Sequence, residues 1–113
     1  MKYIGSCHCK NIEFEVETDL EKIIQCNCSI CTRRNAKMIL VPKQNFNLTK
    51  GENDLSLYQF NSNIAKHYFC KRCGIYTHHN RKSDPSGMGV NLGCIDQLDA
   101  TGYEVISFDG RKL

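Results

Sequence analysis

The alternation of apolar and acidic residues over 11–17 marks the clearest element of the chain. Ile12, Phe14 and Val16 occupy every second position, and glutamates occupy the positions between them. Because successive side chains of a strand point to opposite faces, this pattern predicts a strand with one buried face in an antiparallel sheet. Residues 2–5 are expected to pair with it as a hairpin.

Short apolar segments between polar turns predict further strands along most of the chain. The segment 37–41 contains four consecutive apolar residues, so we expect it to be buried on both faces. Two strands over 55–60 and 65–69 are joined by the polar connection 61–64, which is typical of a hairpin. The remaining strands are expected over 21–25, 75–80, 88–92 and 103–108.

Polar residues separate these strands and leave little room for helices. They predict a turn over 49–54 and a loop over 81–87. The only helix is expected to be short, either around 29–35 or near 96–99. A length of 113 residues corresponds to one domain, which would span residues 1–113. The sequence therefore predicts a single, mainly β domain.

Eight cysteines dominate the candidate chemistry, and seven of them lie in tight groups. The groups are Cys7 and Cys9, then Cys26, Cys28 and Cys31, then Cys70 and Cys73. The N-terminus does not resemble a signal peptide, and the longest apolar run, 38–41, is too short to span a bilayer. We therefore expect a soluble, cytoplasmic protein without a membrane partner. In that reducing compartment, clustered cysteines are typical of metal sites rather than disulfides.

The spacing within each group suits a metal ion. In the Cys-x-x-Cys-Gly segment the chain makes a tight turn, so backbone N–H groups are expected to point at the thiolate of Cys70. Gly74 can adopt the positive φ angle that the exit from such a turn requires. In a Cys-x-Cys segment, such as Cys7 and Cys9, the two side chains point to the same face of an extended chain and can reach one ion.

Spacing alone leaves the division of the ligands open. Seven thiols divide into a closed site of four and an open site of three, in which Cys26, Cys28 and Cys31 would cap one face of an ion. Alternatively, the two Cys-x-x-Cys pairs would form a zinc ribbon and leave Cys7, Cys9 and Cys26 unused. The first division uses every clustered thiol and is favoured. All-thiolate sites at these spacings favour zinc, so two zinc ions are expected.

The formal net charge of +3 does not indicate a nucleic-acid partner. Seven thiolates and two Zn²⁺ ions together contribute −3, which brings the total to zero. The basic excess therefore balances the metal–thiolate sites, and we expect no nucleic-acid binding.

Three motifs resemble those of a known family. Residues 5–9 read Gly-Ser-Cys-His-Cys, residues 26–31 read Cys-Asn-Cys-Ser-Ile-Cys, and residues 69–75 read Phe-Cys-Lys-Arg-Cys-Gly-Ile. In this order they resemble the glutathione-dependent formaldehyde-activating (Gfa-like) enzyme family, to which centromere protein V also belongs. Residues 58–60 and 89–94 fit the same family, so the resemblance covers nearly the whole chain.

The resemblance implies a fold, a ligand set and an activity. The fold is a β-tent, made of small antiparallel sheets pinned by zinc. Cys7, Cys9, Cys70 and Cys73 would share a structural zinc, and Cys26, Cys28 and Cys31 would hold a catalytic zinc. The activity is carbon–sulfur lyase chemistry, the reversible formation of S-hydroxymethylglutathione. The expected partners are therefore a small thiol such as glutathione and an aldehyde.

Four side chains that follow the thiol groups are candidates for substrate binding. Arg33 and Arg34 come just after the group of three and could receive a carboxylate. His78 and His79 come after the Cys-x-x-Cys pair and could supply a proton near neutral pH. Because adjacent strand residues face opposite ways, we expect one histidine to be exposed and the other partly buried.

Other residues are expected to be structural. The alternation of His67 with its neighbours predicts a strand-surface position, and Cys94 is expected to be a small core residue. The missing fourth ligand of the three-thiol site separates the candidate functions. A substrate in that position indicates a lyase, whereas Cys94, a histidine or a partner protein there indicates a non-catalytic zinc-binding module. A labile ion at this site would instead indicate a sensor of metals or electrophiles. The oligomeric state is not predicted by the sequence.

Overall fold

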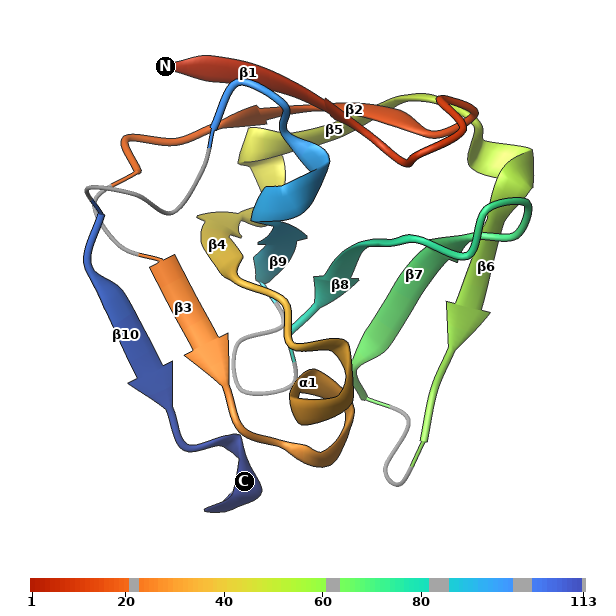
Figure 1. Ribbon diagram of the computed structural model, residues 1–113. Coiled ribbons are helices and arrows are strands. Elements are labelled where there is room, and N and C mark those ends of the chain that lie inside the picture. Colours follow the sequence, from red (N-terminus) through yellow and green to blue (C-terminus); the bar gives the residue numbers. More distant parts are fainter. Residues whose placement is uncertain (21–22, 61–63, 82–85, 99–102, 113) are drawn as a thin grey trace.

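The computed structural model describes residues 1–20, 23–60, 64–81, 86–98 and 103–112, and over these ranges the protein is mainly β (Figure 1). Its single α-helix in these ranges, α1, spans Ser29–Arg34. The strands are β1 (Lys2–Ser6), β2 (Glu13–Glu17), β3 (Ile23–Cys26), β4 (Met38–Pro42), β5 (Phe46–Lys50), β6 (Leu55–Tyr58), β7 (Lys66–Cys70), β8 (Tyr76–Asn80), β9 (Gly87–Asn91) and β10 (Val105–Phe108).

A three-stranded sheet in the order β1-β2-β5 contains the predicted hairpin. β1 and β2 pair antiparallel, with Gly5 opposite Phe14. Phe14 and Val16 are fully buried, whereas Glu13, Glu15 and Glu17 lie on the more solvent-exposed face. The prediction from the alternating pattern is therefore confirmed.

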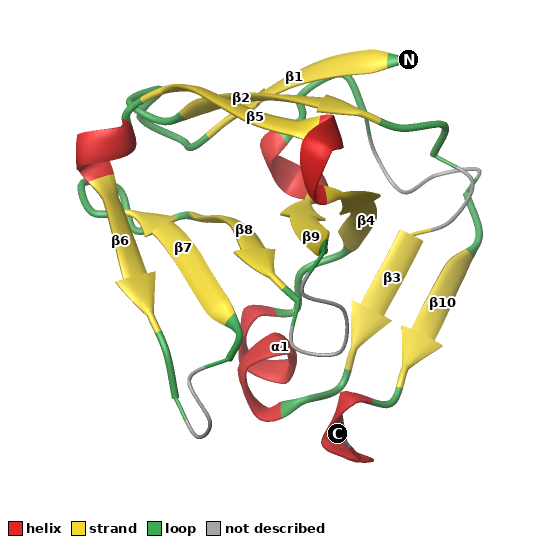
Figure 2. Cartoon of the chain, turned by 180° about the vertical axis from the view of Figure 1, so that it is seen from behind, coloured by secondary structure: helices red, strands yellow, loops and turns green. Residues whose placement is uncertain are grey.

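The second sheet contains seven strands over the described residues, in the order β10-β3-β4-β9-β8-β7-β6. Most neighbours pair antiparallel, as predicted, and β10 pairs parallel with β3, which makes the sheet mixed at this edge. In Figures 1 and 2 the strands of this sheet extend away from the three-stranded sheet, and α1 and the C-terminus lie at the opposite end of the molecule. This arrangement of the two sheets corresponds to the predicted β-tent fold.

The main core lies between the two sheets. Phe14 and Val16 of β2 meet Ile39 and Val41 of β4 and Val90 of β9 in one buried cluster. Met38, Ile39 and Val41 of β4 are buried and Leu40 is half-buried, so both faces of the strand are largely covered, as its apolar run predicts. The two sheets therefore share one apolar core. A single pair of strands would bury too little apolar surface to be stable on its own.

The predicted turn over 49–54 is wrong at its first two residues. Residues 49 and 50 belong to β5, which the sequence analysis did not identify. The turn itself begins at Gly51, where φ is 91°, and continues as the 3-10 helix Glu52–Asp54. β5 contains only two half-buried apolar side chains, Phe46 and Leu48, so its identity depends on pairing with β2.

Several sequence predictions fall partly on residues outside the described ranges. They are the start of the strand at 21–25, the connection 61–64, the loop 81–87 and the helix near 96–99. The strand expected over 103–108 lies within the described residues and begins two residues later, at Val105. Of the two places considered for the single short helix, the one around 29–35 is confirmed as α1.

Candidate metal centres and active-site pocket

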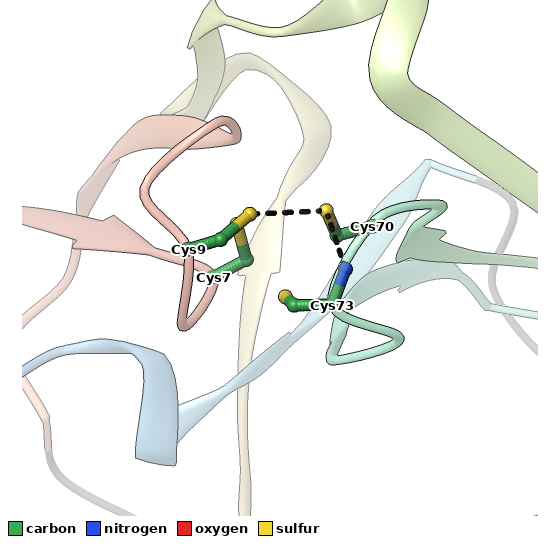
Figure 3. Close-up of side chains that lie close together, drawn as sticks. All are labelled: Cys7, Cys9, Cys70 and Cys73. Carbon is green, nitrogen blue, oxygen red and sulfur yellow. Dashed lines mark hydrogen bonds between the residues drawn. The ribbon is translucent and has the colours of Figure 1, made fainter.

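Four cysteines from two separate parts of the chain converge at one end of the molecule (Figure 3). Cys7 and Cys9 lie in the turn between β1 and β2, while Cys70 ends β7 and Cys73 follows it. The Sγ atom of Cys9 lies 3.6 Å from that of Cys7 and 3.6 Å from that of Cys70. All four sulfur atoms lie within 4.8 Å of one another.

Backbone geometry explains why these thiols converge. The N–H groups of Arg72 and Cys73 point at Sγ of Cys70, at 3.4 and 3.5 Å, as the turn spacing predicts. Gly74 has a φ angle of 78°, which confirms its predicted role at the exit of the turn. On the other side, the N–H group of Ile12 donates to Sγ of Cys7 at 3.3 Å.

The spacing of the four sulfur atoms fits a tetrahedral metal ion. Four sulfurs at about 2.3 Å from a zinc ion would lie roughly 3.8 Å from one another. The observed 3.6 Å separations are close to this value, and they are far longer than the roughly 2.05 Å of a disulfide bond. All eight cysteines lie in described ranges, and all eight are free thiols.

A second group of three thiols lies at the opposite end of the tent. Cys26 ends β3, Cys28 is the N-cap of α1, and Cys31 lies one turn into the helix. Since the side chain of an N-cap lies over the third residue of its helix, the Cys-x-x-Cys spacing brings these two thiols together. The three sulfur atoms lie within 4.8 Å of one another. The N–H group of Cys28 also donates to Sγ of Cys26 at 3.4 Å.

The thiols of this second group differ in their acidity. Burial raises the pKa of Cys31, the most deeply placed of the three. Burial acts in the same direction on Cys28, but N–H groups at the start of α1 and the neighbouring thiols outweigh it and lower the pKa. Cys28 is therefore the thiol of this group that loses its proton most readily.

Cys94 does not join the three-thiol group in the part of the chain that the structure describes. It is 5% exposed, lies in the main core, and donates from its Sγ atom to the carbonyl of Tyr76 at 3.5 Å. Cys94 is therefore a small core residue, as the sequence predicts, and the three-thiol group keeps an open side.

A pocket of about 330 Å³ opens beside the three thiols. This volume falls at the lower end of the range for small-molecule sites. Ile24, Met38 and Leu40 form its apolar floor. Cys26, Cys28 and Cys31 all line it, whereas none of the four cysteines of the other group does.

The C-terminal segment closes one side of this pocket, which the sequence analysis missed. Phe108, Gly110 and Arg111 line the cavity. The Nε atom of Arg111 donates to the carbonyl of Asn27 at 2.8 Å, so the segment is tied to the loop between Cys26 and α1. No local motif marks this contact, because it depends on the parallel pairing of β10 with β3.

The three histidines of β7 and β8 are all buried, which corrects two expectations. His78 and His79 are 4% and 8% exposed, so neither is the exposed member of the pair, and His67 is 5% exposed rather than a surface residue. The two faces of β8 are covered by different elements. His78 contacts Phe46 on the side of the three-stranded sheet, with ring centroids 4.4 Å apart, whereas His79 and His67 line the pocket.

The electrostatic state of these histidines follows from their burial. Burial lowers the pKa of His67 and His78 to about 4 and that of His79 to about 3. Nearby cations make a smaller contribution in the same direction for His67 and His79. All three imidazoles are therefore neutral at pH 7.

The two candidate arginines lie on α1 but do not line the pocket. Arg33 is exposed and donates back to the carbonyl of Ser29 at 2.9 Å. The guanidinium of Arg34 lies 3.8 Å above the ring centre of Tyr76, and its charge acts to lower the pKa of Cys31. Arg34 therefore contributes positive charge close to the three-thiol group.

Together these features define a class: a small β protein with two thiolate clusters suited to metal, one closed and one beside a pocket. Comparison with known protein families identifies the family to which this chain belongs. Residues 2–108 match the model of the family "Glutathione-dependent formaldehyde-activating enzyme", and the chain belongs to this family.

A solved structure supports the fold. The crystal structure of a Rhodobacter sphaeroides protein, a structural-genomics target, superimposes with a TM-score of 0.84. Its sequence is 37% identical, and the match covers 94% of this chain and 100% of that one. Among the described residues, no helix has the length and apolar character needed to cross a membrane.

Proposed function

We propose that this protein is a zinc-dependent carbon–sulfur lyase that acts on a thiol–aldehyde adduct such as S-hydroxymethylglutathione. Family membership supports a formaldehyde- and glutathione-related enzyme. The observation that carries the proposal is the asymmetry of the two thiol groups. The group of three lines a pocket, and the group of four does not.

The two groups have different roles in this proposal. Cys7, Cys9, Cys70 and Cys73 hold a structural zinc, since four sulfurs complete a tetrahedral shell. Cys26, Cys28 and Cys31, which line the pocket, would hold a second zinc. When bound there, this ion would stabilise the sulfur of the thiol substrate as a thiolate, which lowers the barrier for forming and breaking the carbon–sulfur bond.

The protein supplies the surroundings in which this chemistry occurs. The apolar floor and the C-terminal segment restrict water, which favours the adduct over free hydrated aldehyde. Of the four substrate-binding candidates predicted from the sequence, His79 is the one that lines the pocket, so the geometry favours it as a substrate contact. Arg34 acts on Cys31 through its positive charge. Arg33 does not line the pocket, so it would contact a substrate carboxylate only where the substrate extends beyond the pocket.

An exchange experiment tests the proposed reaction. Zinc-loaded protein is added to formaldehyde and glutathione, and two-dimensional exchange NMR measures the rate at which the adduct forms and dissociates. The proposal expects a faster rate than in buffer alone. Cys31→Ser should abolish the acceleration, whereas Cys94→Ser, which alters a buried thiol outside both groups, should retain it. No acceleration by the wild-type protein with both zinc ions bound would refute the activity.

The alternative function, a non-catalytic zinc-binding module, makes a different prediction. In that case the three-thiol zinc would be fully coordinated and would not respond to added glutathione. Cobalt substitution distinguishes the two, since the visible spectrum of a Co²⁺–thiolate site changes when a substrate thiol joins it. The pocket beside the three thiols favours the lyase, and the free thiols fit a reducing compartment such as the cytoplasm.

A further inference from the structure

His67 stands out among the buried histidines because its ring has no hydrogen-bond partner. Both Nδ1 and Nε2 are buried, and neither meets a partner in the described part of the protein. The other two rings each have a partner at one nitrogen: Nδ1 of His78 lies 2.8 Å from Oγ1 of Thr77, and Nδ1 of His79 lies 2.6 Å from the hydroxyl of Tyr76. A buried polar group without a partner costs folding free energy, so this exception calls for a ligand.

The position of His67 directs its ring toward the pocket. In the seven-stranded sheet it lies opposite Tyr58 on β6 and opposite His79 on β8, so all three project from the same face. His79 in turn lies opposite Gly89 on β9. A Cβ atom on Gly89 would overlap the His79 ring, so this glycine makes room for the row of rings. His67 and His79 both line the cavity.

Ring stacking holds His67 in one orientation. Its centroid lies 5.7 Å from that of Phe60 and 5.3 Å from that of His79, with interplanar angles of 22° and 28°. A phenylalanine would make the same stack without leaving two ring nitrogens unpaired. Packing alone therefore does not explain an imidazole at this position.

We propose that His67 is a substrate-binding residue whose imidazole hydrogen-bonds the hydroxyl group of the thiol–aldehyde adduct. The inference rests on the proposed lyase function, because it needs the adduct's sulfur at the three-thiol group across the same pocket. With the sulfur bound there, the hydroxyl of an S-hydroxymethyl group lies only one carbon away. His67 then fixes the carbon–oxygen end of the adduct while the thiols fix the sulfur end.

The chemistry of the ring favours a hydroxyl over a carboxylate. Burial lowers the pKa of His67 to about 4, so the ring is neutral and offers one N–H donor and one nitrogen acceptor. A hydroxyl group both donates and accepts, and it matches either nitrogen. A carboxylate only accepts, so it matches the N–H donor of the neutral ring but not the second, accepting nitrogen.

Two variants of His67 and one control test this role. His67→Phe keeps the stack but removes both hydrogen-bonding atoms, whereas His67→Gln keeps a donor and an acceptor. His78→Phe alters an equally buried histidine on the other face of the sheet, outside the pocket. We expect kcat/KM to fall about 10- to 100-fold in His67→Phe, to be largely retained in His67→Gln, and to be unchanged in His78→Phe.

A binding measurement separates this inference from the lyase activity itself. S-ethylglutathione has the shape of S-hydroxymethylglutathione but no hydroxyl. Wild-type protein should bind the hydroxymethyl compound at least about 10-fold more tightly than the ethyl compound, and His67→Phe should lose this preference. An unchanged preference in His67→Phe overturns the role of His67, even if turnover is normal. If the preference for the hydroxymethyl compound depends on His67 but the wild-type protein shows no turnover, the contact is supported and the lyase activity is refuted.

NMR of the wild-type protein provides a test that needs no variant. Imidazole ¹⁵N signals report hydrogen bonding at each ring nitrogen. Adding the hydroxymethyl compound should shift the His67 signals and leave those of His78 in place. Unshifted His67 signals at saturating ligand would overturn the proposal.

Discussion

The different roles proposed for the two thiol groups lead to a prediction about stability. The group of four joins the turn of the three-stranded sheet to the end of β7 in the seven-stranded sheet. Cys9 and Cys70 lie 61 residues apart in the sequence, so an ion held between them closes a large loop. The group of three joins only the end of β3 to the first turn of α1.

Loop closure provides the expected magnitudes. If a metal cross-link constrains the unfolded chain as a disulfide does, a loop of about 60 residues contributes about 4 kcal/mol, and a loop of about six residues contributes about 2 kcal/mol. A small domain has a total stability of roughly 5–15 kcal/mol. At the lower end of this range, Cys70→Ser with Cys73→Ser should therefore remove most of the stability, whereas Cys28→Ser with Cys31→Ser should remove less than half of it.

Urea unfolding of the zinc-loaded proteins, followed by circular dichroism, measures the two losses, and metal analysis counts the ions bound. We expect each double variant to lose one zinc ion. The variant of the closed site should lose about twice as much free energy of unfolding as the variant of the open site. Equal losses would refute the view that one site is structural and the other is spared for chemistry.

Three further changes have defined outcomes. Gly110→Ala places a Cβ atom against Sγ of Cys26, so it should weaken zinc binding at the three-thiol group alone, and metal analysis should find one tight zinc ion rather than two. A result of two tight ions would contradict this packing. Gly89→Ala overlaps the His79 ring and should destabilise the fold by about 1–3 kcal/mol in urea unfolding, with an increase in KM; a neutral effect would show that the ring moves freely. His78→Phe should flatten the dependence of stability on pH. The pKa of His78 falls from 6.5 in the unfolded chain to about 4 in the fold, so acid protonates the unfolded state first, and stability decreases as the pH falls from about 6.5 to 4. Between pH 7.5 and 5.5 this histidine should cost the wild type about 1 kcal/mol that the variant does not lose, and parallel losses in the two proteins would contradict the assignment.

The local pattern of the sequence determined much of the fold and the ligand chemistry. Alternation identified β2, and the apolar run identified β4, because each pattern reflects the faces that one strand buries. Cysteine spacing also predicted the turn at Cys70, with its inward N–H groups and the positive φ angle of Gly74. These features depend on residues within one turn or one strand, so local sequence is sufficient to specify them.

Features that depend on distant strands could not be predicted in this way. The burial of both His78 and His79 depends on two different layers covering β8, and the ring row that includes His67 depends on pairing across β6, β7 and β8. The closure of the pocket by Gly110 depends on β10 joining β3 in parallel. The sequence determined which side chains could bind a metal. Only the tertiary structure decided which thiol group lies beside a pocket, because the walls of that pocket come from segments as far apart in the sequence as Ile24 and Arg111.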